Sequence, residues 1–213
     1  EAGYLAYFFY AFASVFIIVN PVEATMVFIS LTPGASARER ARISLRAASV
    51  AYTVALLFAL SGDVVLRFFG TTVDSLRVAG GILLFIMAIE MLKAKPRRKV
   101  TEVEMADASD REDVSIFPLA TPLLTGPGAI TTVIVLMGTA SGPAEKGVIL
   151  LALTVTFLVS YLILRSSEYV SRILGVTGIL VMTRIMGLLL GAIAVNFVAV
   201  GAWNIYAGLA GLS

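Results

Sequence analysis

The sequence predicts an all-α integral membrane protein whose six transmembrane helices form a 3+3 inverted-topology repeat, with discontinuous first and fourth helices. Three observations lead to this fold. The 213-residue chain is 59% hydrophobic and only 14% charged, with a mean hydropathy of +0.95. Several apolar segments lack charge for long enough to cross a bilayer, which takes about 20 residues. The two halves of the chain also repeat one pattern, with proline at a matching position.

Apolar runs separated by charged or Gly- and Pro-rich connections define the six predicted spans. They cover approximately residues 4–32, 40–62, 72–92, 115–140, 146–165 and 178–208. The second span is short, because Arg46 and Asp63 bracket only 16 uncharged residues. We therefore expect this helix to extend into both interfaces, with the side chains of Arg42 and Arg46 reaching the water.

The distribution of basic residues predicts how the chain is oriented. Thirteen of the 16 Lys and Arg residues lie in or beside the connections that follow the first, third and fifth spans. Connections rich in basic residues stay on the cytoplasmic side, so we expect both termini outside and the 93–113 connection inside. In that connection a basic cluster precedes an acidic one. We interpret it as a membrane anchor and flexible linker, with contact to lipid headgroups as the alternative.

An internal repeat organises the chain as a single transmembrane domain. Its parts are repeat one (1–92), the linker (93–113) and repeat two (114–213). Aligning Pro21 with Pro127 also aligns Thr25 with Thr131, and further matches downstream keep an offset of 105 to 107 residues. Because each repeat holds three spans, an odd number, the second copy must enter the membrane in the opposite sense to the first. Such inverted repeats with interrupted helices are typical of secondary transporters.

Each repeat begins with a helical segment that a proline motif interrupts. The first run is about 43 Å long as an unbroken helix, more than a hydrocarbon core of about 30 Å, so its break at Asn20-Pro21 falls inside the membrane. The fourth span breaks at Thr125-Gly126-Pro127-Gly128, about 16 Å from its end. Proline removes a backbone donor and glycine relaxes the helix. The freed backbone groups must then face protein or a water-filled cavity.

The two breaks together are the predicted binding site. We expect the inverted repeat to bring them face to face, so that N–H groups at the start of one half-helix lie near carbonyls at the end of another. This pairing suits a small zwitterion, an amino acid, and the small residues nearby leave little room for a large side chain. The alternative is a pair of structural kinks, which are common in membrane helices. The candidate substrate-binding residues are Asn20, Pro21, Ala24, Thr25, Thr125, Gly126, Pro127, Gly128, Thr131 and Asn196.

Three ionisable residues, Glu23, Glu90 and Arg184, are candidates for coupling or gating. Glu23 follows the first break, either as a charge partner of the helix N-terminus or as a proton carrier or partner of the substrate ammonium. Glu90 is interpreted as an interfacial ion-pair partner first and a coupling residue second. Arg184 is a gate or a residue that snorkels at the interface. Asn196, about 18 Å deeper in the sixth span, either binds ligand or bridges helices.

Four segments carry a resemblance to a known family. They are IIVNPVEA, AGGILLFIMAIEML, TPLLTGPGAITTVI and RIMGLLLGAIAVNF, and the resemblance extends over essentially the whole chain. The chain resembles the MarC-related, SnatA-like family of small neutral amino acid transporters. The resemblance implies a multi-pass carrier in the plasma or inner membrane, which moves glycine, alanine and similar amino acids by cation-coupled symport. The residues on the family pattern are Asn20, Pro21, Gly126, Pro127, Gly128, Thr131, Arg184, Gly187 and Asn196, whereas Glu23 stands where the family usually has glycine.

Composition narrows the possible functions. Without Cys or His, disulfides, Cys or His metal sites and imidazole proton relays are impossible, and no metal or cofactor is expected. The net charge of +2 is too small to suggest nucleic acid. An intramembrane enzyme would need a His, an Asp pair or a Ser with a base inside the bilayer, and the spans offer only Ser and isolated Glu. We therefore expect no enzymatic activity. The predicted function is secondary active transport of small neutral amino acids by alternating access, coupled to H⁺ or Na⁺. The alternatives are a small-solute channel and an amino acid exporter of the same fold.

Overall fold

The computed structural model describes residues 2–93 and 124–211, and within them every regular element is a helix. Five helical segments are long and apolar enough to cross a membrane, if the two helices before residue 32 count as one, and a sixth is shorter. The prediction of an all-helical membrane fold is therefore confirmed. The linker beyond Lys93 and the first half of the fourth span lie outside the described residues. The helices are α1 (Ala2–Val19), α2 (Pro21–Leu31), α3 (Ala37–Phe68), α4 (Val73–Leu92), α6 (Pro127–Thr139), α7 (Pro143–Arg165) and α8 (Ser167–Leu209).

The predicted break in the first span is confirmed at Asn20. Helix α1 ends at Val19, Asn20 has φ 44° and ψ 61°, and α2 begins at Pro21. Asn20 is the one residue other than glycine with a positive φ in the described part of the chain. Asparagine tolerates the left-handed region better than most residues, and proline is favoured at the first position of a helix. Asn-Pro is therefore well suited to ending one helix and starting the next.

Helix α3 is longer than its apolar run, as its flanking charges led us to expect. It includes Arg42, Arg46 and Asp63. Its start is set by a capping box, in which Ser36 Oγ accepts from the Glu39 N–H and the Glu39 carboxylate accepts from the Ser36 N–H. Its end is set by Gly70, whose φ of 63° lets the Thr71 N–H turn back and donate to the Leu66 carbonyl.

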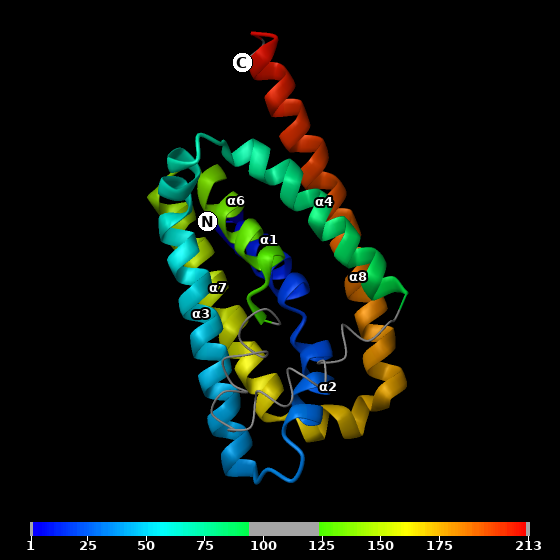
Figure 1. Ribbon diagram of the computed structural model, residues 1–213. Helices are drawn as coiled ribbons and strands as arrows, with labels where there is room; N and C mark the ends of the chain where they lie inside the picture. Colours follow the sequence, from blue (N-terminus) through cyan, green and yellow to red (C-terminus); the bar gives the residue numbers. More distant parts are fainter. Residues whose placement is uncertain (1, 94–123, 212–213) are drawn as a thin grey trace.

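Helix α8 differs from the prediction at its start. The sixth span was expected from residue 178, but α8 begins at Ser167 and runs for 43 residues, about 65 Å. Gly175, with φ 62° and ψ 177°, kinks it. The segment before the kink crosses the end of the bundle beneath α2, and the segment after it rises along α4 (Figure 1). No proline marks this bend, so the hydropathy pattern alone did not reveal it.

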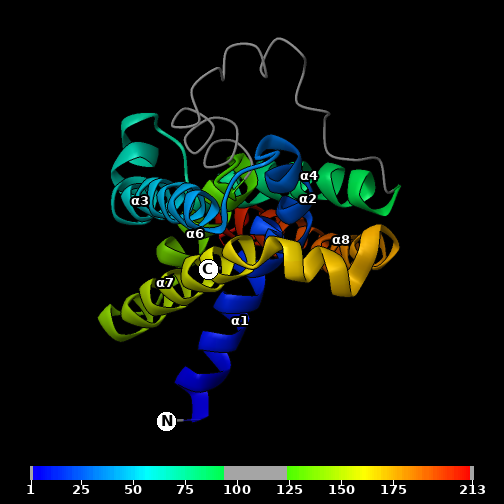
Figure 2. The same cartoon turned by 90° about the horizontal axis from the view of Figure 1, so that it is seen from below.

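Two pairs of antiparallel helices flank α2, α6 and the end of α1, while the start of α1 projects from the bundle (Figures 1 and 2). One pair is α3 with α7, and the other is α4 with α8, while α6 packs against α3, α4 and α1. In the most apolar 18-residue window of the α1–α2 span, 67% of the window is buried inside the protein, against 28% to 39% of the corresponding window in each of the other four spans. The interrupted span is thus the central one. The outer helices expose large apolar side chains such as Leu57, Leu60 and Leu188, as expected for surfaces that face lipid.

Glycines let the outer pair α4 and α8 approach closely. A Cβ at Gly81 would lie 2.9 Å from the Ala194 carbonyl oxygen and 3.0 Å from Phe197 Cβ. A Cβ at Gly187 would lie 3.2 Å from the Ala88 carbonyl oxygen and 2.8 Å from Met91 Cβ. In both places the backbone of one helix rests on the other, which is the usual role of small residues between membrane helices.

Candidate functional site

The two predicted breaks lie beside each other in the interior. A Cβ at Gly128, in the first turn of α6, would lie 3.5 Å from Ile18 Cγ2, in the last turn of α1. Asn20 is 3% exposed and Thr125 is 1% exposed. The end of α1 and the start of α6 both lie at the centre of the bundle (Figure 1). The structure therefore brings the Asn-Pro and Gly-Pro motifs to one place.

The end of α1 supplies backbone acceptors at this place. The last regular bond of α1 runs from the Asn20 N–H to the Phe16 carbonyl, at 2.9 Å. The next carbonyl, of Ile17, would accept from residue 21, but proline has no N–H. The carbonyl ends of a helix also carry partial negative charge. This end of α1 is suited to a positively charged group.

The start of α6 supplies backbone donors. Its N-cap is Gly126, in an extended conformation with φ −78° and ψ 175°, and among the described residues no side chain makes a capping bond to it. Because Pro127 lacks an N–H, the first N–H groups that need an acceptor belong to Gly128 and Ala129. Gly126 is partly exposed and Pro127 is exposed. The helix start thus runs from an exposed Pro127 into the buried Gly128 and Ala129, and its partial positive charge suits an anion.

The start of α2 is different, because the Asn20 side chain caps it and Glu23 adds a carboxylate to its first turn. Asn20 Nδ2 donates to Glu23 Oε2 at 2.6 Å, and the Glu23 N–H points to Asn20 Oδ1 at 3.5 Å. Glu23 is only 8% exposed, so its carboxylate does not face an open vestibule. The helix dipole stabilises a carboxylate at this position. The two breaks thus differ chemically: α2 has a capping asparagine and an acid in its first turn, whereas α6 has glycine at the N-cap and no acid in its first turn.

Four threonines surround the breaks. Thr25 Oγ1 donates to the Val22 carbonyl at 2.6 Å, and Thr125 Oγ1 donates to the Ala51 carbonyl of α3 at 2.9 Å. Thr131 packs against Gly80 of α4. Thr132 is fully buried, and its hydroxyl has no hydrogen-bond partner. A buried hydroxyl without a partner is costly and therefore needs an explanation.

Comparison with known proteins identifies the family. The sequence pattern of the MarC family integral membrane proteins matches residues 5–206. The chain belongs to the MarC family.

Three relatives illustrate how widely this MarC-family sequence is shared. A UPF0056 membrane protein of Methanocaldococcus jannaschii is 40% identical over 92% of this chain and 96% of its own length. YhcE of Escherichia coli is 35% identical over 95% of this chain and 94% of its own, and YvbG of Bacillus subtilis is 31% identical over 90% and 92%. Both are named as UPF0056 membrane proteins. No solved structure matches the chain.

Most predicted site residues of this MarC protein gather at the breaks, but three do not. Pro21 and Ala24 are buried beside Asn20. Glu90, Arg184 and Asn196 are exposed, on the outer surfaces of α4 and α8. Glu90 and Arg184 lie at the same end of the α4–α8 pair, because Gly187 packs on Met91. Their roles in substrate binding, coupling or gating remain predictions.

Sequence reasoning did not single out Thr132 as a site residue. The repeat pairs Thr131 with Thr25, whereas Thr132 aligns with Met26, so symmetry pointed away from it. Its signal is structural, a fully buried and unpartnered hydroxyl in the second turn of the uncapped helix. We therefore regard the buried Thr132 hydroxyl, which has no hydrogen-bond partner among the described residues, as a candidate ligand contact.

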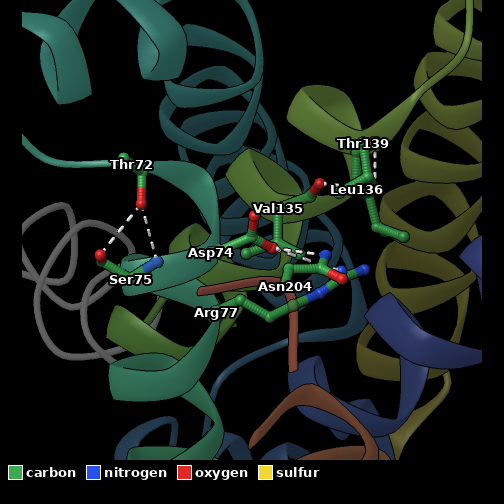
Figure 3. Close-up of polar contacts among 8 residues, drawn as sticks. All are labelled: Thr72, Asp74, Ser75, Arg77, Val135, Leu136, Thr139 and Asn204. Carbon is green, nitrogen blue, oxygen red and sulfur yellow. Dashed lines mark hydrogen bonds and ion pairs between the residues drawn. The ribbon is translucent and has the colours of Figure 1, made fainter. Parts of the chain in front are cut away.

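A polar cluster joins the start of α4 to the far end of α8 (Figure 3). Asn204 Nδ2 donates to Asp74 Oδ1 at 2.9 Å, and Arg77 Nη1 lies 3.8 Å from the same oxygen. The Arg77 side chain is 13% exposed and its guanidinium lies 5.7 Å from the centre of the Phe197 ring. Most of the Arg77 side chain is therefore held within the protein, against α8.

A second ion pair lies at the opposite end of the bundle. Arg40, near the start of α3, pairs with Glu168, near the start of α8. The Arg40 side chain is 12% exposed. Each end of the bundle thus has a mostly buried arginine that links two helices from different halves of the chain.

Proposed function

We propose that this MarC-family protein is a secondary active transporter of small neutral amino acids, such as glycine and alanine, that works by alternating access. The observation that carries the proposal is the meeting of the two helix breaks at Asn20-Pro21 and Gly126-Pro127 in the interior of the bundle. Interrupted helices at the centre of a membrane protein are the usual binding sites of secondary transporters. Irregular backbone at that depth is otherwise costly.

The chemistry of the breaks favours a zwitterion. The substrate carboxylate accepts hydrogen bonds from the Gly128 and Ala129 N–H groups, and its ammonium group donates to the Ile17 carbonyl. Charge-assisted hydrogen bonds of this kind are roughly twice as strong as neutral ones. Thr132 supplies a further hydroxyl. Since the start of α2 already holds the Glu23 carboxylate, we assign the substrate carboxylate to the start of α6.

The packing around Gly128 favours a small substrate. A Cβ at Gly128 would already lie 2.8 Å from Leu84 Cδ2 and 3.2 Å from Met87 Sδ. Ile18 lies on the same side. Little free volume is left beside the helix start, so glycine and alanine fit better than amino acids with large side chains. The exposed faces of Gly126 and Pro127 are the route by which such a molecule reaches the site.

Inverted symmetry is part of the proposal, and the contacts between the outer helices support it. Residues that match across the repeat pack on each other: the Tyr52 and Phe157 rings, 105 positions apart, have centroids 6.0 Å apart. Gly81 and Gly187, 106 positions apart, make equivalent contacts on each other's helices. Pairing of each helix with its own counterpart is what a twofold axis in the membrane plane produces.

Coupling and gating complete the proposed cycle. Both termini lie outside, the 93–113 linker is cytoplasmic, and a proton or sodium gradient across the cell membrane drives transport. Glu23 is the coupling acid, because it is buried and bonded to Asn20 at the break. The Arg40–Glu168 pair and the Asp74–Arg77–Asn204 cluster close the two ends of the bundle in alternation. Opening of one end requires its helices to separate while the other end stays closed.

Uptake by the purified protein in liposomes tests this function. Labelled glycine or alanine should accumulate when a proton or sodium gradient is imposed, and the uptake should saturate with substrate. Gly128→Val, whose side chain would press against Leu84 and Met87, should abolish uptake. Gly147→Val, on α7, where a Cβ meets nothing within 4 Å, is the matched control. Lack of uptake under every gradient would refute the proposal, and flux that does not saturate would indicate a channel.

A further inference from the structure

A groove between α3 and α7 opens on the outer surface, away from the breaks. It has a volume of about 170 Å³ and is lined mainly by apolar surface from both helices. The lining residues are Leu45, Ala48, Ser49, Tyr52, Thr154, Phe157, Leu158 and Tyr161. The groove lies on a helix pair that spans the membrane, so its natural surroundings are lipid chains.

The polar atoms in the groove walls are already bonded within the protein. The Tyr52 hydroxyl and Thr154 Oγ1 lie 3.0 Å apart, and Thr154 Oγ1 also donates to the Leu150 carbonyl. The Tyr161 hydroxyl accepts from Arg165 Nη1 at 3.2 Å. An occupant therefore meets satisfied hydroxyls, aromatic rings and aliphatic side chains, which is a suitable surface for a hydrocarbon chain.

One end of the groove is positively charged. Arg165 lies one turn beyond Tyr161 on the groove-lining stripe of α7, and Arg42 lies about one turn before Leu45 on α3. Both side chains are exposed. The helices are antiparallel, with Tyr52 opposite Thr154 and Phe157, so Arg42 and Arg165 lie at the same level. The two arginines thus flank the mouth of the groove.

Within the described residues, neither Arg42 nor Arg165 forms an ion pair with a carboxylate. Glu39 accepts from the Ser36 N–H at 2.8 Å, and Glu168 pairs with Arg40. Among the described residues, the two arginines therefore give the groove mouth a positive charge. Basic pockets between transmembrane helices are characteristic binding places for anionic lipid headgroups.

The dimensions match one lipid leaflet. From Arg42 to Tyr52 is about 15 Å along α3, half of a hydrocarbon core of about 30 Å. If the two arginines lie at the headgroup level, the Tyr52–Thr154 contact lies near the bilayer midplane. A single acyl chain can then follow the groove along its whole length, while its phosphate contacts both guanidiniums. Arginine also suits phosphate by the geometry of its fork.

We propose that this groove is a binding site for an anionic phospholipid, which places its phosphate between Arg42 and Arg165 and one acyl chain along α3 and α7. The lipid holds together a helix pair that joins the two halves of the chain. It binds on the outside of the bundle, independently of the breaks. The site does not depend on what the protein transports.

Native mass spectrometry of the purified full chain tests the proposal, with phosphatidylglycerol and phosphatidylcholine of the same acyl chains as probes. Phosphatidylglycerol should bind preferentially. The double variant Arg42→Gln/Arg165→Gln should weaken that binding by roughly 25-fold, about fivefold for each guanidinium. Arg172→Gln, which removes an exposed arginine of α8 away from the groove, should leave it unchanged. Equal binding of the two lipids, or no effect of the double variant, would overturn the proposal.

Two further measurements separate the lipid from other occupants. Ser49→Phe fills the groove without altering charge, and it should abolish the preference for long-chain over dihexanoyl phosphatidylglycerol. Competition by inorganic phosphate at concentrations equal to the lipid would indicate an anion site and contradict a lipid site. The chain has no cysteine, so the substitution Leu158→Cys introduces a single thiol into the groove. Its efficient oxidation to a disulfide-linked dimer in native membranes would show that a second copy covers the groove, and would also overturn the proposal.

Discussion

Gly81 and Gly187, 106 positions apart, make the same contacts on each other's helices. Gly81 meets Ala194, Phe197 and Val198 of α8, and Gly187 meets Ala88, Met91 and Leu92 of α4. The second set of three matches the first at the same offset of 106. An exchange of this kind is expected where two inverted copies of one unit pack across a twofold axis. The predictions below depend on this arrangement and on the meeting of the two breaks.

The paired glycines should be equally sensitive to substitution. Gly81→Ala and Gly187→Ala each place a methyl group against the backbone of the facing helix, and should destabilise the protein by about 1–3 kcal/mol. Gly208→Ala, where a Cβ meets nothing within 4 Å, should be neutral or stabilising. Thermal unfolding in detergent measures all three. Unequal effects at Gly81 and Gly187 would argue against equivalent packing.

Pro21→Ala should impair transport without impairing folding. Alanine restores an N–H that can bond the Ile17 carbonyl, which we assign to the substrate ammonium. Loss of one charge-assisted hydrogen bond should lower the rate of uptake at low substrate by about tenfold or more. Pro143→Ala is the control, since Pro143 occupies the equivalent first position of α7 at the exposed end of that helix. Retained uptake in Pro21→Ala would exclude the proposed role of the carbonyl.

Glu23→Gln should separate coupling from stability. The glutamine side-chain oxygen can still accept from Asn20 Nδ2, and Asn20 still caps α2. The unfolding temperature should therefore change little. The fixed negative charge is lost, so uptake should no longer respond to the imposed gradient while exchange of internal for external substrate continues. Asp63→Asn, which alters an exposed acid paired with Arg67, is the control. Unchanged gradient dependence in Glu23→Gln would remove Glu23 from the coupling role.

Thr132→Val should weaken substrate binding and strengthen the fold. Valine replaces the buried hydroxyl, which has no partner, with a methyl group of similar size, and should stabilise the substrate-free protein by about 1–2 kcal/mol. If the hydroxyl contacts substrate, KM should rise at the same time. Thr156→Val is the contrasting variant, because Thr156 Oγ1 already donates to the Ala152 carbonyl at 2.8 Å. Stabilisation without a change in KM would assign Thr132 no part in binding.

The sequence predicted the features that depend on local backbone chemistry. The Asn20-Pro21 break, the start of α6 at Pro127 and the extension of α3 past its charges follow from proline, glycine and side-chain length. Proximity of the two breaks followed from the repeat. The positions of these breaks and helix ends can be predicted without knowing which helix packs against which.

Features that depend on packing were beyond the sequence. In helices that are apolar on every side, periodicity does not mark the buried face, so the exposed position of Asn196 and the buried position of Arg77 could not be predicted. In the sequence, Gly175 looks like the other glycines of the membrane helices, so the kink at this position could not be predicted. The starts of α2 and α6 differ because the capping residue Asn20 aligns with Gly126, which has no side chain, and Glu23 aligns with Ala129.

Counterflow in liposomes tests the zwitterion site most directly. Liposomes that contain the purified protein and are loaded with unlabelled glycine are diluted into labelled glycine. The account predicts rapid exchange that excess external alanine inhibits, whereas glycinamide and acetate, which each carry only one of the two charges, do not. Absence of exchange, or equal inhibition by alanine and by either singly charged compound, would contradict it.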